Sequence, residues 1–78
     1  MLTKNNLINI TNEQLFEIIE ELIDLYSLER ILENITKICE EKAEHVKSIW
    51  QDRNLAVIYE SFAKKLHKQY IAAKGFGV

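Results

Sequence analysis

The apolar residues of this chain recur at helical spacing, and the side of the helix on which they lie changes twice. With about 100° per residue, one apolar stripe covers residues 15–26, a second covers 28–50 and a third covers 55–73. Continued as one straight helix, each stripe would lie roughly half a turn away from the one before it. A stripe in an unbroken helix drifts slowly and does not reverse, so the pattern predicts breaks near Ser27 and Asp52.

These breaks predict an all-α fold of three helices whose apolar stripes share one core. A shorter amphipathic helix is expected over about residues 12–26, followed by a long antiparallel helical hairpin formed by about 28–51 and 53–74. In such a hairpin, residues whose numbers sum to about 105 lie level with each other. Trp50 is then level with Leu55, and Val46 with Tyr59, so that large side chains meet across the hairpin.

Polar caps are expected to mark the helix ends, because residues 1–74 contain neither glycine nor proline. Thr11 begins a capping box for the first helix, and Ser27 is a suitable cap for the second. Either Asp52 or Asn54 can cap the third helix. This helix is expected to stop near residue 74, with Gly75 as the left-handed terminator.

The chain length allows one small domain, predicted here over residues 11–74. A flexible arm is expected over residues 1–10 and a flexible tail over 75–78. A single core in a chain of 78 residues is only modestly stabilising, and oligomerisation commonly supplements it. The apolar side of the first helix also spans about 180°, more than the stripe of an ordinary surface helix. We therefore expect a homodimer.

The charges are unevenly distributed along the chain. The net charge of −2 argues against a general polyanion binder. Residues 1–39 nevertheless hold seven acids and three bases, whereas residues 53–78 hold one acid and five bases. This asymmetry would help antiparallel helices, or two subunits, to attract each other. Because no signal peptide or membrane-spanning stretch is apparent, the sequence predicts a soluble, cytoplasmic protein.

Lys42 is the main anomaly, because its position falls within the second apolar stripe. One hypothesis is that its methylene stem lies along the core while the ammonium group reaches solvent. The other is that the ammonium pairs with a carboxylate, from Glu60 or from another subunit, and sets the register of an interface. Cys39, the only cysteine, lies in the same stripe and is expected to act as a small core residue.

Some apolar residues have no place in a three-helix core and therefore suggest a contact surface. Val57 and Ile71 lie on the outer side of the third helix, and Phe76 and Val78 follow beyond them. Such residues can contact a second subunit or an unknown protein partner. The residues that we predict for this interface are Phe16, Ile23, Lys42, Val57, Ile71 and Phe76.

The charged run from Glu40 to His45 resembles a metal-binding segment only in part. Glu41 and His45 share a helix face, but helical di-iron sites use a Glu-x-x-His pair, and here Lys42 stands three residues before His45. His67 is expected about 10 Å from His45 along the helix axes, too far for one ion. A solvated charged face without a metal or other cofactor is the favoured interpretation.

Catalytic patterns are missing from the sequence. No serine stands with a histidine and an acid in a recognisable catalytic context, and the two glycines are both near the end of the chain, where no phosphate-binding loop forms. We therefore predict no catalytic residues and no enzymatic activity.

The third helix carries a basic face formed by Lys64, Lys65 and Lys68. A basic last helix in a three-helix domain suggests DNA binding. Specific base recognition, however, usually uses Arg, Asn or Gln near the start of a recognition helix, and the long second helix suits a hairpin better than a helix-turn-helix motif. A solvated face that balances the acidic first helix is favoured, with nucleic-acid binding as the alternative.

One segment resembles a known pattern. Residues 38–46, with the sequence ICEEKAEHV, followed by WQD at 50–52 and LA at 55–56, are similar to a pattern in short uncharacterised bacterial all-helical proteins. The resemblance covers roughly a third of the chain. It implies a helix, a break after the tryptophan and another helix, and it assigns no activity and no site residue.

These observations together predict a non-catalytic helical protein–protein interaction or adaptor module that acts as a homo-oligomer. The alternative is a small DNA-associated regulatory protein that uses the basic third helix. A metal-dependent helical enzyme is a more distant third hypothesis.

Overall fold

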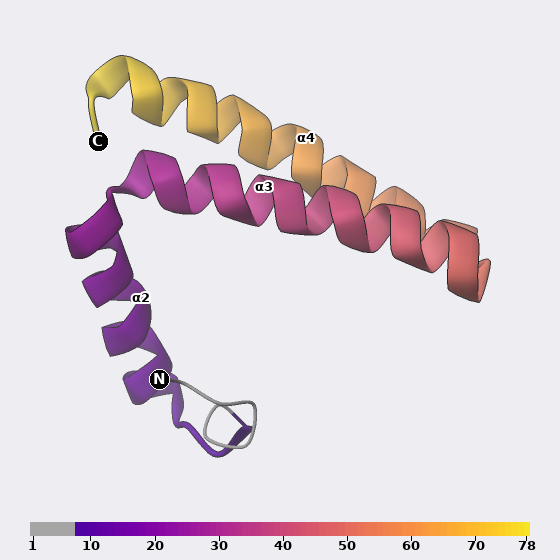
Figure 1. Ribbon diagram of the computed structural model, residues 1–78, viewed down its shortest axis with the longest axis horizontal. Coiled ribbons are helices and arrows are strands. Elements are labelled where there is room, and N and C mark those ends of the chain that lie inside the picture. Colours follow the sequence, from indigo (N-terminus) through magenta and orange to yellow (C-terminus); the bar gives the residue numbers. More distant parts are fainter. Residues whose placement is uncertain (1–7) are drawn as a thin grey trace.

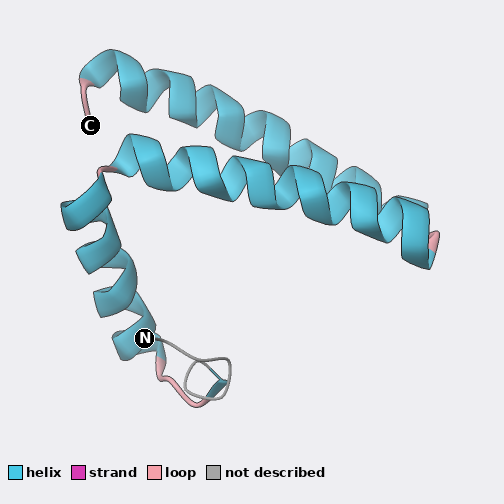
Figure 2. Cartoon of the chain, viewed as in Figure 1, coloured by secondary structure: helices cyan, strands magenta, loops and turns pink. Residues whose placement is uncertain are grey.

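The structure, a computed structural model, describes residues 8–78. The elements are α2 (Asn12–Tyr26), α3 (Leu28–His45), the short π-helix η1 (Val46–Trp50) and α4 (Arg53–Phe76) (Figure 1). Only short loops join these helices (Figure 2). Within the described residues the all-α, three-helix fold is confirmed, including the long antiparallel hairpin formed by α3, η1 and α4. Most of the arm predicted over residues 1–10 lies outside the described residues.

The predicted capping box begins α2. Thr11 Oγ1 accepts a hydrogen bond from the Gln14 amide at 3.1 Å, and Gln14 Oε1 accepts one from the Thr11 amide at 2.9 Å. Two main-chain donors at the helix start are thereby satisfied. Glu13 adds a favourable negative charge to the first turn.

Both predicted breaks are confirmed, and each is capped by the expected side chain. The Ser27 hydroxyl accepts a hydrogen bond from the Arg30 amide at 3.3 Å and begins α3. The Asp52 carboxylate accepts one from the Leu55 amide at 3.0 Å and begins α4, so Asp52 rather than Asn54 is the cap. The backbone φ of Ser27 is +79°, which only a minority of residues with a side chain adopt.

The first arm of the hairpin ends in η1, a widened helical turn after which the chain reverses direction. The π-helical residues of η1 are followed by Gln51, whose φ of +53° places it in the left-handed region. The Asp52 amide then donates a hydrogen bond to the Val46 carbonyl at 3.2 Å. Gln51 and Asp52 are the only residues between η1 and α4, a connection length that suits antiparallel helices.

A seam of small and medium-sized side chains holds the two arms of the hairpin together. Thr36 and Ala43 lie seven residues apart on α3, as Ala56 and Ala63 do on α4, so each pair recurs on one side of its helix. Small side chains allow two helix axes to approach closely. The buried residues of the described chain are Thr36, Ala43, Val46, Ala56, Ala63 and Ala73.

The predicted register of the hairpin is confirmed, but its interior differs from the expectation. One groove of the hairpin is lined in common by Val46, Trp50, Leu55 and Tyr59, as level residues should be. The large residues Ile58 and Phe62, which the periodicity assigns to the core, remain exposed. The close approach along the alanine seam leaves no room for them between the helices.

The far end of the hairpin extends beyond the predicted end of the third helix. α4 continues to Phe76 rather than stopping near Lys74, and Gly77 rather than Gly75 takes the left-handed conformation, with φ +74°. The main-chain oxygen of Val78 accepts hydrogen bonds from the amides of Leu28 at 2.7 Å and Glu29 at 3.2 Å. The predicted tail over residues 75–78 thus contributes the last turn of α4 and a cap for the start of α3.

The expectation of one core shared by all three helices was wrong. α2 turns away from the hairpin at Ser27 and runs at an angle to it (Figure 1). None of its residues is buried. The described chain measures 37 × 36 × 19 Å, the dimensions of a flat L rather than a closed bundle. The reason lies in the connection, because one residue between α2 and α3 does not let the two helices lie antiparallel.

Candidate functional site

One broad side of the hairpin is apolar, and we call it the apolar face. On α4, Leu55, Ile58, Tyr59 and Phe62 recur at spacings of three and four, which places them on one side of the helix. Leu55 and Tyr59 line a groove of about 520 Å³ together with residues of α3 and η1, which connects the two arms into one surface. The apolar face consists of Ile35, Ile38, Lys42, Val46, Ile49, Trp50, Leu55, Ile58, Tyr59 and Phe62, and its groove is also lined by the polar residues Glu41 and His45.

Most large side chains of the apolar face are open to solvent. Trp50 is 65% exposed, although its ring contacts the His45 imidazole edge-on with 6.0 Å between ring centroids. Phe62, near the middle of α4, is 53% exposed. Contiguous exposed apolar surface of this kind is typical of a contact site for another macromolecule.

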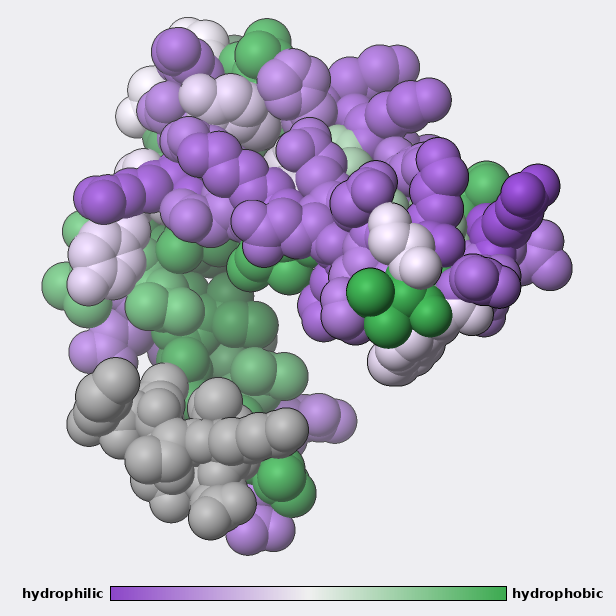
Figure 3. Space-filling view, turned by 45° about the vertical axis from the view of Figure 1, so that its right-hand side comes forward, coloured by the Kyte–Doolittle hydropathy of each residue, from purple (hydrophilic) through white to green (hydrophobic). Residues whose placement is uncertain are grey.

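α2 is a second apolar surface, and it is also uncovered. Leu15, Ile19, Leu22 and Tyr26 recur at spacings of four, three and four along one side of the helix, and all four are exposed. Figure 3 shows hydrophobic residues gathered along α2 and under the adjoining part of the hairpin, on either side of a hollow. The opposite side of α2 is acidic, with five carboxylates and no basic residue between Asn12 and Tyr26.

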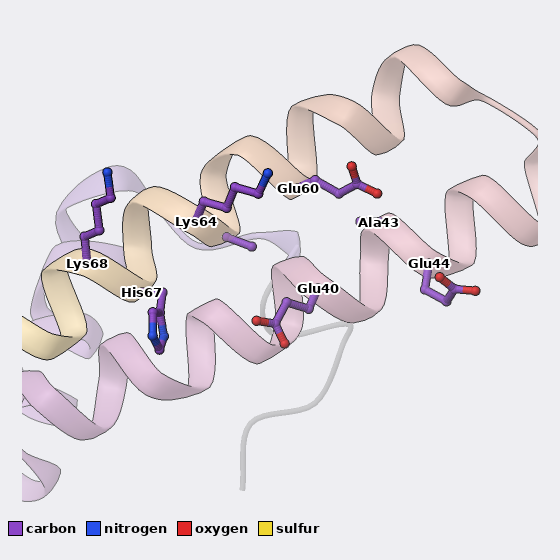
Figure 4. Close-up of a pocket in the computed structure, with 8 residues that line it drawn as sticks. Glu40, Ala43, Glu44, Glu60, Lys64, His67 and Lys68 are labelled. Atoms are coloured by element: carbon purple, nitrogen blue, oxygen red, sulfur yellow. The ribbon is translucent and has the colours of Figure 1, made fainter.

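The other broad side of the hairpin carries a groove of mixed charge, which we call the polar groove. Its floor is formed by Ala43 and Ala63, and it has a volume of about 610 Å³. Charged side chains from both helices surround this floor (Figure 4). They are Glu40 and Glu44 from α3 and Glu60, Lys64, His67 and Lys68 from α4.

The predicted basic face is divided in the structure. Lys64 and Lys68 line the polar groove, where three carboxylates accompany them, whereas Lys65 does not line it. The acids reduce the positive potential that a phosphate backbone would meet. The three lysines therefore do not form one unopposed basic surface.

The predicted interface residues lie in four separate parts of the structure. Phe16 is exposed on α2 and Ile23 is half-buried there, while Lys42 belongs to the apolar face. Val57 and Ile71 are each seven residues from Lys64 and so share the polar-groove side of α4. Phe76, which is 84% exposed, lies at the end of α4. The structure does not bring these six residues together.

Lys42 is exposed, and its suggested intrachain partner lies elsewhere. Lys42 lines the groove of the apolar face, whereas Glu60 lines the polar groove on the opposite side of the hairpin. Among residues 8–78 the one salt bridge joins Lys37 and Glu33, at 3.1 Å. The prediction that Lys42 pairs with Glu60 of the same chain was therefore wrong.

The part of the chain that the structure describes contains no group of three His, Cys, Asp or Glu side chains arranged to hold a metal ion. Glu41 and His45 line the groove of the apolar face, while Glu44 lines the polar groove. The charged residues from Glu40 to His45 are thus divided between two sides of α3. In residues 8–78, no helix combines the length and the apolar character that crossing a membrane requires.

Apart from Lys42, the residues of the apolar face, among them Ile58 and Phe62, are missing from the predicted interface. The periodicity shows that they belong to an apolar stripe, but it does not show which part of that stripe faces α3. The alanines were the available signal, because a seven-residue repeat of small residues on both helices marks the line of closest approach. Comparison with protein-family models, curated proteins and solved structures found no match for this chain.

Proposed function

We propose that this protein is a non-catalytic helical interaction module that acts as a homodimer, with a second copy covering the apolar face and α2. The observation that carries the proposal is the simultaneous exposure of both surfaces. α2 has no buried residue, and Phe62 and Trp50 are exposed on the hairpin. Apolar surface of this extent gains free energy when it is removed from water, by roughly 25 cal/mol for each Å².

The total surface area supports a partner of considerable size. The accessible surface of the chain is 6690 Å², for a mass of 9.2 kDa. A compact monomer of that mass exposes about 4,900 Å². The open arrangement of α2 and the hairpin leaves apolar surface that a second copy can cover.

The charge distribution favours a second copy as the partner. α2 holds five acids and no bases, whereas α4 holds five bases and one acid. Within the described residues, α2 contacts α3 and does not contact α4. In a homodimer, α2 of one copy can lie near α4 of the other, and the two opposite charges then attract.

The DNA-associated alternative has less support. Its basic residues Lys64 and Lys68 share the polar groove with Glu40, Glu44 and Glu60, and the net charge of the chain is −2. Retention of the protein on heparin at low salt, lost at moderate salt, would favour this alternative.

A matched pair of substitutions on α4 tests the homodimer. Phe62→Glu places a charge on the apolar face, and Val57→Glu places the same charge on the polar-groove side, where the native residue is 60% exposed. Sedimentation equilibrium is expected to give twice the 9.2 kDa chain mass for the native protein and for Val57→Glu. Phe62→Glu is expected to be a helical monomer, because burying an unpaired carboxylate in an interface is costly. A monomeric native protein would contradict the proposal, and so would a Phe62→Glu variant that remains fully dimeric.

A further inference from the structure

We infer that the two copies exchange their α2 helices, so that α2 of each copy packs on the apolar face of the other copy's hairpin. This inference rests on the homodimer proposed above and specifies how that dimer is built. It also names the surface that each α2 covers.

The connection at Ser27 explains why α2 does not cover the hairpin of its own chain. Helices that lie antiparallel are joined by loops of about two to five residues, whereas only Ser27 lies between Tyr26 and Leu28. The turn is also held in place, because the Ser27 amide donates to the Ile23 carbonyl at 2.8 Å and the Ile31 amide donates to the Ser27 carbonyl at 3.3 Å.

A cation–π contact adds to the rigidity of this corner. The Arg30 guanidinium lies over the Tyr26 ring, with 5.5 Å between the guanidinium carbon and the ring centroid. Residues on both sides of Ser27 are thereby linked. α2 is held away from its own hairpin (Figure 1), and its apolar side is available to another chain.

The dimensions of the two surfaces are compatible with exchange. α2 has 15 residues and α4 has 24, which correspond to about 22 Å and about 36 Å of helix at 1.5 Å per residue. The apolar face is therefore long enough to receive a whole α2. The hollow in Figure 3 lies between the two apolar surfaces of one copy, where a second copy's α2 can enter.

Exchange also provides a carboxylate for Lys42. This residue lines the groove of the apolar face, and the one salt bridge within residues 8–78 does not involve it. On α2, Glu21 lies three residues from Ile18 and borders the apolar side of the helix. An α2 from the second copy, laid on the apolar face, brings Glu21, at the edge of its apolar side, toward Lys42.

Cross-linking between two different chains tests the exchange directly. Both chains carry Cys39→Ala, which removes the native thiol; one also carries Ile19→Cys on α2, and the other carries Phe62→Cys on the apolar face. The chains differ in an affinity tag and are mixed, unfolded and refolded together before a short bismaleimide cross-linker is added. The matched control replaces the second chain by one with Glu60→Cys, whose thiol lies in the polar groove.

The expected result is a mixed cross-linked dimer of the Ile19→Cys and Phe62→Cys chains, formed about tenfold more efficiently than with Glu60→Cys because the first two thiols are held close together. If the native protein is dimeric but the mixed product does not exceed the control, the exchange is wrong and the homodimer stands. Efficient closure within one chain that carries both Ile19→Cys and Phe62→Cys would also overturn the exchange. A monomeric native protein would overturn both proposals.

Discussion

The hairpin and α2 are both amphipathic, yet they differ in how their apolar sides are covered. In the hairpin, Ala43 and Ala63 are buried at the contact between the helices, and larger residues such as Phe62 lie outside it. α2 has large apolar residues and no small-residue seam, and none of them is buried. The comparison shows that this chain uses small side chains to hold itself together and presents large ones to its surroundings.

The two connections create this difference. Two residues, Gln51 and Asp52, allow the arms of the hairpin to lie antiparallel, whereas the single residue Ser27 holds α2 at an angle. A helix of 15 residues is only marginally stable in water by itself. In the proposed homodimer, a second copy provides the surface that stabilises α2, whereas the seam stabilises the hairpin within one chain.

Lengthening the connection at Ser27 should let α2 be covered by its own chain, as the arms of the hairpin are. Of the changes considered, this one should have the largest effect on the dimer. A flexible insertion of about four residues after Ser27 brings the loop into the range that antiparallel helices use. α2 is then expected to fold onto its own hairpin and convert the dimer into a monomer, as measured by light scattering. The same insertion between Gln51 and Asp52 lengthens only the hairpin loop and is expected to leave the dimer intact. A dimer that survives the first insertion unchanged would argue against restraint by Ser27.

Ala63→Leu tests whether the seam holds the hairpin. The larger side chain has no space at the contact between the helices, so the free energy of unfolding is expected to fall by about 1–3 kcal/mol. Urea denaturation followed by circular dichroism measures the change. Ala72→Leu makes the same substitution at an exposed position of α4 and is expected to change stability by less than about 0.5 kcal/mol. Equal effects of the two variants would show that the seam is not the structural core.

Lys42→Glu tests the charge between the apolar face and α2. It replaces an attraction by a repulsion toward the acidic helix, so the dissociation constant of the dimer is expected to rise about tenfold, equivalent to about 1.4 kcal/mol. Lys64→Glu, in the polar groove and away from the apolar face, is the control and is expected to raise the constant much less. An unchanged dimer of raised stability in a Lys42→Met variant would show that Lys42 does not set the register by an ion pair.

Asp52→Ala removes the cap of α4 and should have the smallest effect. Loss of the hydrogen bond from the Leu55 amide is expected to lower the free energy of unfolding by about 1 kcal/mol. Asn54→Ala is the matched control, because the Asn54 side chain does not cap this helix. Thermal unfolding of both variants would measure the difference, and a larger loss for Asn54→Ala would contradict the assignment of the cap.

The local features of the fold could be predicted from the sequence because they depend on neighbouring residues. The capping box at Thr11 and the breaks at Ser27 and Asp52 each involve groups a few residues apart. The end of α4 was misplaced because a partner distant in sequence determines it. There, the main-chain oxygen of Val78 accepts hydrogen bonds from Leu28 and Glu29.

The candidate site could be predicted only in part, for a similar reason. Lys42 was recognised because a charge within an apolar stripe is visible in the sequence. Ile58 and Phe62 were assigned to the core because a stripe shows which residues share a side but not how much of that side a neighbour covers. Coverage depends on the separation of the helices, which the alanine seam determines.

Hydrogen exchange measured over a range of protein concentrations compares the two regions most directly. If a second copy covers α2, the amides of residues 12–26 will become more protected as the concentration rises through the dissociation constant of the dimer. The amides along the seam of the hairpin will change much less. Protection of α2 that is strong and independent of concentration, together with a monomeric mass, would contradict the central claim that a second copy covers this helix.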